Sequence, residues 1–225
     1  MSVDITSGVA KLSIIFNSSD PIKWEDLLSI FKEHEIKIFG QGFAIVDGGE
    51  QVEAFIGKGD FLEWVYIPQK KTLLLTSNDI EKSFMHFINI NKQIKDLFKS
   101  EEKWSRNFSY YEVDIRNELV PSQMSPLEIF KKIANEKMFE PFQSILTPKE
   151  IQMFMYRFIS TSNTDVNLKK VIPFIDVSLW PMVENTDRLM AQIIYRDYDI
   201  EKIRETILKL SEAILTFIKS KEELA

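Results

Sequence analysis

The sequence predicts an α+β fold made of two tandem pseudo-repeats, each an antiparallel sheet with two helices, with an extra helix in the second repeat. Short runs of β-branched and aromatic residues bounded by turn residues indicate strands. Apolar residues at helical spacing indicate amphipathic helices between and after these runs. Two stretches of the first half also match two stretches of the second half, in the same order. We therefore expect a first repeat over residues 1–100 and a second over residues 101–225.

The first half has the pattern of a strand, a helix, four strands and a long helix. Trp24 and Phe31 lie on one face of the first helix, and Asn78 with Glu81 forms a capping-box pattern before the second. Residues 100–107 are charged and lack periodicity, so we interpret them as a linker. The expected elements are strands at 9–16, 43–46, 52–57, 61–67 and 72–76, and helices at 24–35 and 79–99.

The second half repeats this order and adds a helix. Ser125 and Glu128 form a capping box with Pro126 at the first helical position. Thr147 begins a similar pattern, for an inserted helix near 138–160 that we expect to reach Ser160. The other expected elements are strands at 110–115, 172–180 and 188–195, and a final helix at 199–221.

The internal matches favour a duplication. Residues 12–32 lie over residues 111–131 without a gap, at an offset of 99. Residues 73–82 lie over residues 193–202, at an offset of 120. The offset grows by 21 residues (120 − 99), about the size of the inserted helix. Because both matches fall at equivalent places in the element order, we infer an old duplication with a helix inserted in the second copy.

The order of elements in each half resembles the repeat of the TATA-box-binding protein fold. This resemblance is one of topology and covers both halves. It implies that the helices lie on one face of the sheet, and that the other face forms a saddle. A fold does not carry a function, so no functional residue is transferred. A longin or roadblock module is a looser alternative for the first half.

Composition limits the classes of function. The chain has 225 residues, no cysteine and a net charge of −6, which excludes disulfides and thiolate metal sites and argues against a broad nucleic-acid footprint. Its 22 lysines far outnumber its six arginines, and arginine is the usual residue for bidentate phosphate or base recognition. No apolar run approaches the length of a membrane span, and the first residues make a poor signal peptide. We expect a cytoplasmic protein without membrane contact.

Six of the seven glycines fall between Gly40 and Gly59. A phosphate-binding loop needs glycines between a strand and a helix, whereas strand-like residues follow both Gly42 and Gly59. Asp47-Gly48-Gly49 stands between two strand-like runs, which is a hairpin signal. We interpret the stretch as two or three successive sheet turns, with a ligand loop as the alternative.

Other residue patterns give weak indications of chemistry. His34 lies beside two glutamates, but we interpret it as a solvated side chain, and His86 as part of a helix next to its apolar face. Glu112, Asp114 and Arg116 share one face of a strand, where a salt bridge is a simpler interpretation than acid–base catalysis. We therefore assign no catalytic residue, and we expect no metal and no cofactor.

Apolar surface gives the clearest indication of function. The stretches 73–75, 172–175 and 193–194 are apolar on both strand faces, so the second face either is covered where the two halves meet or contacts a partner. In the final helix an a/d seam packs on another helix or on the protein's own core, and Leu208 and Leu215 widen it to one side. The candidate partner-binding residues are Leu208, Leu215, Trp104, Phe108 and Tyr110. The last three belong to an aromatic and basic patch that could stack bases or pack as a linker on the domains.

The leading hypothesis is a non-enzymatic interaction or regulatory protein that binds another protein or forms a homodimer. A nucleic-acid-binding protein that uses the saddle is the alternative, and the acidic balance disfavours it. A small-molecule sensor or enzyme with a pocket between the halves is the third hypothesis. The aromatic patch and Leu208 with Leu215 are the places where such contacts are expected.

Overall fold

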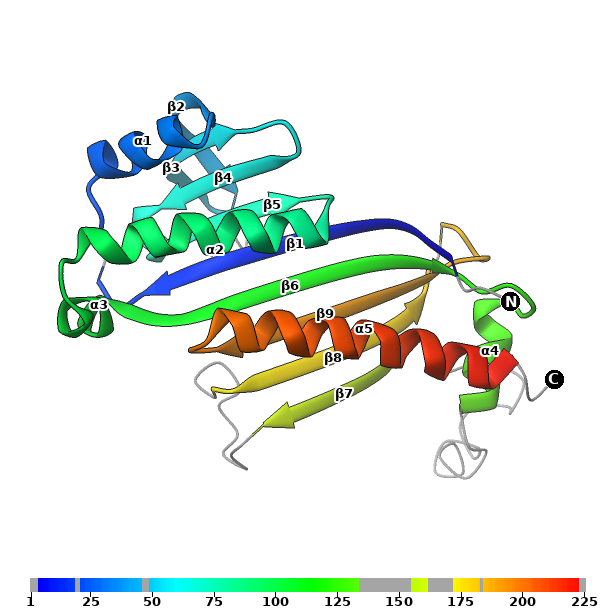
Figure 1. Ribbon diagram of the computed structural model, residues 1–225. Coiled ribbons are helices and arrows are strands. Elements are labelled where there is room, and N and C mark those ends of the chain that lie inside the picture. Colours follow the sequence, from blue (N-terminus) through cyan, green and yellow to red (C-terminus); the bar gives the residue numbers. More distant parts are fainter. Residues whose placement is uncertain are drawn as a thin grey trace.

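An antiparallel sheet organises the protein (Figure 1). The computed structural model describes residues 4–18, 21–45, 49–133, 155–161, 172–182 and 184–222. Within these residues the sheet has nine strands in the order β2-β3-β4-β5-β1-β6-β9-β8-β7, and each neighbouring pair is antiparallel. The strand bounds are β1 Asp4–Phe16, β2 Lys37–Ile45, β3 Gln51–Lys58, β4 Leu62–Ile67, β5 Thr72–Ser77, β6 Phe108–Val120, β7 Tyr156–Thr161, β8 Phe174–Pro181 and β9 Leu189–Asp197.

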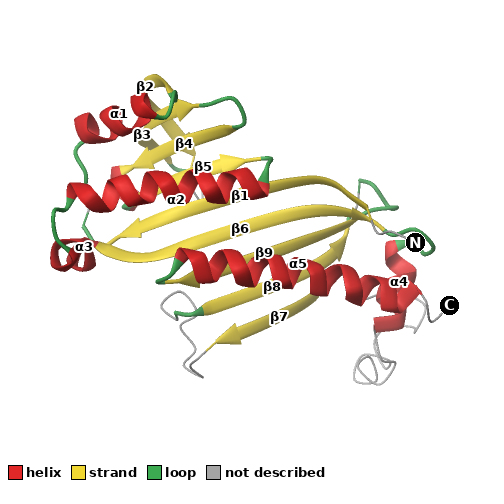
Figure 2. Cartoon of the chain, in the orientation of Figure 1, coloured by secondary structure: helices red, strands yellow, loops and turns green. Residues whose placement is uncertain are grey.

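Helices cover one face of this sheet (Figures 1 and 2). Helix α2 packs on β1 and β5, α5 packs on β9, and α1 packs on α2 and β2. The short α3 lies at one end of the central strands, and α4 lies beside the end of α5. The helix bounds are α1 Trp24–Glu33, α2 Ile80–Leu97, α3 Glu101–Asn107, α4 Pro126–Ile133 and α5 Ile200–Glu222, with a 3₁₀ turn η1 at Pro68–Lys70.

The two halves share one continuous sheet, where the sequence predicted a sheet in each half. The 13-residue strands β1 and β6 pair along their length and join the halves. Leu12 faces Val113 and Ala10 faces Ile115 beneath the helices, and all four side chains are buried. Full burial of a side chain the size of Leu12, Val113 or Ile115 contributes about 1.5–3 kcal/mol. The α+β class and the antiparallel sheet are therefore confirmed.

Apolar residues on the second sheet face of the first half have a local explanation. Trp64 and Tyr66 of β4 belong to the main core under the helices. Val65 and Ile67 alternate with them and point to the opposite face. There they form a second small buried cluster with Val52, Ala54 and Ala44. Burial on both faces of β4 thus needs no partner.

Helix starts follow the predicted chemistry, with one shift of position. Ser125 and Glu128 form the reciprocal capping box of α4: the Ser125 N–H donates to the Glu128 carboxylate at 2.9 Å, and the Glu128 N–H donates to Ser125 Oγ at 3.3 Å. At α2 the cap is Asp79, one residue after the predicted Asn78, and its Oδ1 accepts from the Lys82 N–H at 3.0 Å. Both patterns place a polar acceptor over unpaired N–H groups of the first turn.

The predicted linker at 100–107 is wrong, because residues 101–107 form helix α3. Ser100 caps this helix by accepting the Lys103 N–H at 3.2 Å. Trp104 anchors it, with its ring stacked on Phe108 and edge-on to Phe98. A helix of seven residues is too short to show an apolar period, so the sequence pattern could not reveal it.

The inserted helix expected to reach Ser160 is also corrected. Residues 156–161 form strand β7, which pairs with β8 from Tyr156 opposite Leu179 to Thr161 opposite Phe174. Sheet pairing overrides the local helical spacing here. Residues 134–154, which hold most of the expected insertion and its Thr147 start, lie outside the described residues.

The described glycines of the 40–59 stretch shape the sheet. Gly40 has φ +92° at a bulge in β2, where the register with β3 shifts between Ile38 and Gly40. A side chain at Gly57 would place its Cβ 2.9 Å from Ile36 Cγ2, so only glycine lets the chain approach this closely. Three of these glycines lie inside strands rather than in turns, so the prediction of turns is right for only part of the stretch. The bulge also lets β2 begin at Lys37, well before the predicted strand.

Candidate functional site

The two histidines, 52 positions apart in the sequence, lie side by side where α1 ends against α2. Their ring centroids are 5.4 Å apart. His34 Nε2 bonds Gln93 Oε1 at 3.0 Å, and Gln93 Nε2 donates to a Glu33 carboxylate oxygen at 3.2 Å. His86 Nε2 is buried without a hydrogen-bond partner, and its ring lies against Phe61 and Trp64. The separate surface and helix roles predicted for the histidines missed this contact.

Burial, followed by the nearby His34, lowers the pKa of His86. The neutral imidazole is therefore the favoured form inside the fold. No group of three or more histidine, aspartate or glutamate side chains able to hold a metal occurs among the described residues. The pair is best understood as a packing contact with a pH dependence.

The predicted trio on β6 lies in a ladder of ion pairs on the sheet face opposite the helices. Arg116 pairs with Asp114 at 3.2 Å, and Gln192 donates to Asp114 at 2.8 Å. Glu112 pairs with Arg196 of β9, whose guanidinium lies 4.9 Å from the Phe174 ring. The salt-bridge interpretation of the trio is confirmed by these contacts.

Further arginines near this face also have their charge paired with a carboxylate. Arg157 makes two hydrogen bonds to the buried Asp176, at 2.9 and 2.6 Å, and Arg188 pairs with Glu118 at 2.8 Å. Binding of a phosphate backbone draws its affinity from cations that replace condensed counterions. An arginine that is already paired with a carboxylate is poorly suited to replace the counterions of a phosphate backbone. These ion pairs therefore weigh against a role of these arginines in binding nucleic acid.

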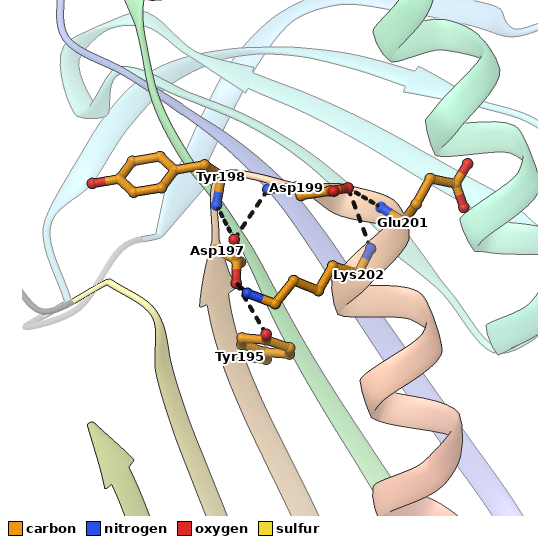
Figure 3. A network of polar contacts seen from close by, with 6 residues as sticks. All are labelled: Tyr195, Asp197, Tyr198, Asp199, Glu201 and Lys202. Carbon is orange, nitrogen blue, oxygen red and sulfur yellow. Dashed lines mark hydrogen bonds and ion pairs between the residues drawn. The ribbon is translucent and has the colours of Figure 1, made fainter. Parts of the chain in front are cut away.

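A denser polar network joins β9 to α5 (Figure 3). The Asp197 carboxylate accepts from Tyr195 Oη at 3.0 Å, from Lys202 Nζ at 2.8 Å, and from the N–H of Tyr198 at 2.7 Å. Asp199 caps the helix by accepting the Glu201 and Lys202 N–H groups at 2.9 and 3.2 Å. Burial alone would raise the pKa of Asp197, but these hydrogen bonds together hold it below its usual value. Each donor in the network serves the strand–helix junction, which is a structural role.

The five predicted partner-binding residues come from two places. Trp104 is 3% exposed and belongs to the core, and Phe108 stacks on it with ring centroids 4.8 Å apart. Tyr110 is half-buried, with Arg196 6.0 Å from its ring. Leu208 is 49% exposed, while Leu215 is half-buried against the core. Their role in binding a partner stays a prediction, and Leu208 presents the most apolar surface among them.

An apolar groove lies on the other flank of α5. It has a volume of about 390 Å³ and runs between α5, β7 and β8. Leu210 and Phe217 border it from the helix, and Ile175 and Val177 from β8. The groove lies within the second half, whereas the third hypothesis from the sequence expects a small-molecule pocket between the halves.

The most exposed apolar surface lies on β2, which no sequence pattern had singled out. Phe39, Phe43 and Ile45 are 67%, 72% and 75% exposed, the highest values among the large apolar side chains that the structure describes. All three belong to an edge strand, with β3 as its neighbour. The sequence predicted this strand only at 43–46, because the bulge at Gly40 interrupts the alternation of its earlier residues. The signal that could have found it is the run without charge from Ile38 to Ile45.

Comparisons with known proteins add little. No protein-family model matches the chain, and no curated protein matches it. Among solved structures, Methanococcus jannaschii TBP is similar over 98% of this chain and 99% of its own, with 10% identity and a TM-score of 0.30. A TM-score this low carries no argument about fold or function. In the part of the chain that the structure describes, no helix is long and apolar enough to cross a membrane.

Proposed function

We propose that this chain is a non-enzymatic protein-interaction module that receives an extended segment of another polypeptide along the edge strand β2. The observation that carries the proposal is the exposure of Phe39, Phe43 and Ile45 on one sheet edge. An edge strand directs every second pair of N–H and C=O groups away from its neighbour. A partner strand would satisfy these groups, and the apolar side chains would supply burial.

The composition of β2 supports this role. Soluble proteins protect sheet edges with lysine, proline or inward-pointing charge. Between Ile38 and Ile45 there is neither a charge nor a proline. Lys37 stands at the start of the strand, and Gln41 is hydrogen-bonded to Glu53 of β3 rather than free to guard the edge. Among the described residues no strand pairs with its outer side, so β2 is available for pairing there.

Labelled peptides provide a direct test. The probe is a panel of fluorescein-labelled nine-residue peptides that alternate Phe, Ile or Val with Thr or Lys. We expect saturable binding to the wild-type chain by fluorescence anisotropy, and binding more than about tenfold weaker for Phe43→Lys. Met85→Lys is the matched control, because Met85 is exposed on α2. Equal binding by wild type and Phe43→Lys would remove β2 as the site.

We also propose that the chain arose by duplication. From the central pair outward, the strands follow β1, β5, β4, β3, β2 on one side and β6, β9, β8, β7 on the other. Both halves end in a strand that leads through an aspartate cap into a long helix. Superposing residues 9–99 on residues 108–222 of an experimental structure should align both long helices and at least three strands. Different strand paths in the two halves would contradict the duplication.

The cytoplasm is the proposed compartment, and a regulatory role there is part of the proposal. The absence of cysteine fits a reducing environment. Fractionation of cells that produce a tagged chain tests the location, and recovery of the chain in a membrane or extracellular fraction would contradict it.

A further inference from the structure

We infer that the segment received by β2 is β2 of a second copy, paired antiparallel about a two-fold axis at Phe43. This inference rests on the proposed function and names its partner. Closed two-fold pairing is the commonest form of self-association, and it requires a patch that is complementary to itself. The residues from Gly40 to Ile45 meet this requirement.

The register follows from the alternation of side chains. In a symmetric antiparallel pair, facing residues point to the same side of the sheet. An axis at Phe43 sets Phe43 against its own copy, Gln41 against Ile45, and Gly42 against Ala44. The two phenylalanines then form a cross-strand aromatic pair, which is among the favourable pairs in sheets. The bulge at Gly40 ends the regular register on one side, so the pairing is short and centred on these residues.

Sterics favour the same arrangement. Gly42 and Ala44 are small and half-buried, and Ala44 packs on the second cluster formed with Val52 and Ala54. On the face that carries them, the pairing would therefore set only small residues opposite one another, Gly42 against Ala44. The opposite face carries Phe43 and Ile45, whose exposed rings and methyl groups would become buried.

Electrostatics offer little resistance. The paired residues carry no charge. Glu53 lies beside Phe43 on β3, so two copies of this carboxylate would stand three strand spacings apart. That distance is about 14 Å at about 4.8 Å per strand, beyond the Debye length of about 10 Å at 0.1 M salt.

Variants of the full chain with a positive or a negative charge at position 43, on the proposed two-fold axis, test the register. Sedimentation velocity at rising concentration should show a dimer for wild type, and dimerisation more than about tenfold weaker for Phe43→Lys and for Phe43→Glu, since like charges then meet. Mixing the two variants should restore the dimer, because lysine then faces glutamate. Met85→Lys should dimerise like wild type, and circular dichroism should show that every variant is folded.

A cysteine trap gives a second measurement that does not depend on affinity. The chain has no cysteine, so one introduced thiol has no competitor. Facing Cα atoms in antiparallel strands lie about 4.5–5.5 Å apart, which suits a disulfide. Phe43→Cys should therefore form a cross-linked dimer on mild oxidation. Gln41→Cys, on the same strand and exposed, should not, because its copy lies four residues away along the partner strand.

The outcomes separate this inference from the proposed function. A wild-type monomer at every concentration overturns self-pairing, while binding of the labelled peptides would still support β2 as a docking strand. A dimer that persists in both charge variants places the interface elsewhere, with Leu208 and Leu215 as the next candidates. A mixture that stays monomeric contradicts the axis at Phe43. A ladder of larger species means open head-to-tail pairing, which also overturns the inference.

Discussion

The two strand–helix junctions, at residues 77–82 and 197–202, are built alike but carry different charge. In both, an aspartate caps the helix: Asp79 accepts the Lys82 N–H at 3.0 Å, and Asp199 accepts the Lys202 N–H at 3.2 Å. In both, the residue two positions earlier accepts the N–H of the cap, at 3.0 Å for Ser77 and 3.3 Å for Asp197. The shared geometry follows from the need to satisfy helix N–H groups.

The difference lies in how the buried position is satisfied. Ser77 is 3% exposed, is neutral and donates its hydroxyl to the Phe61 carbonyl at 3.0 Å. Asp197 is 5% exposed and charged, and Tyr195 and Lys202 donate to it. At the first junction Leu75 holds the place of Tyr195, and Lys82 pairs with Asp79 at 3.0 Å instead. We infer that a buried carboxylate at this position is stable only where donors such as Tyr195 and Lys202 are also present.

This comparison predicts the largest effect for Ser77→Asp. The new carboxylate would face the Phe61 carbonyl oxygen without a hydroxyl to donate, and Leu75 offers no hydrogen bond. We expect a loss of about 3 kcal/mol in the free energy of unfolding, measured by urea denaturation at neutral pH. Ser77→Ala is the control and should cost about 1 kcal/mol. A neutral effect of Ser77→Asp would mean that Lys82 alone can satisfy the charge.

The reverse exchange, Asp197→Ser, should cost less. Serine can still accept an N–H of the first turn and meet the Tyr195 hydroxyl, but the ion pair with Lys202 is lost. We expect a loss of about 2 kcal/mol at neutral pH by the same measurement.

The cost of Asp197→Ser should also depend on pH. The folded-state pKa of Asp197 lies below its usual value. The contribution of this carboxylate is therefore fully present above the unfolded pKa of about 3.9 and is lost as the pH falls through the lower folded value. The gap between wild type and Asp197→Ser should close below about pH 3.9. A constant gap would show that the charge of Asp197 does not carry the effect.

The histidine pair predicts a separate acid response in the first half. The lowered pKa of His86 means that the fold disfavours its charged form. Stability from this contact is present above the unfolded pKa of about 6.5 and declines as the pH falls below it. Among the described residues, charged or titratable groups near the pair are Glu33 at the end of α1, His34 directly after it, and Lys82 on α2, which lies over the Phe61 ring.

His86→Phe should remove this decline between about pH 6.5 and pH 5, while keeping the packing against Trp64. Urea denaturation at several pH values checks the change, with His34→Phe as a second variant. An unchanged slope in His86→Phe would assign the acid response to other groups. Two-dimensional NMR of the imidazoles would then report directly whether the pKa of His86 lies below its ordinary value.

The sequence predicted the helices and strands better than it predicted which side chains are exposed or in contact. The capping box at Ser125 and the long helices follow from local chemistry, so they were predictable. The helix at 101–107 and the strand at 156–161 depend on contacts with Phe98 and β8, which no local pattern contains. The contact between His34 and His86 requires α1 to lie on α2, and the exposure of Phe43 requires β2 to be an edge. Both depend on strand order, which the sequence pattern does not specify.

The smallest effect is expected for Asp199→Ala, which removes the cap of α5 but leaves Asp197 and its partners in place. The N–H groups of Glu201 and Lys202 would turn to water at the exposed start of the helix, so we expect a loss of about 1 kcal/mol in the free energy of unfolding.

Asp79→Ala is the matched variant in the first half, and it should lower stability more, because Asp79 also holds the ion pair with Lys82. In Asp199→Ala the lysine keeps its pair with Asp197. Urea denaturation of the two variants at low and high salt decides the point: the difference between them should shrink as salt screens the Lys82 pair. A larger loss for Asp199→Ala would mean that Asp199 also orients the Asp197 network, and that the two junctions differ in more than the placement of one charge.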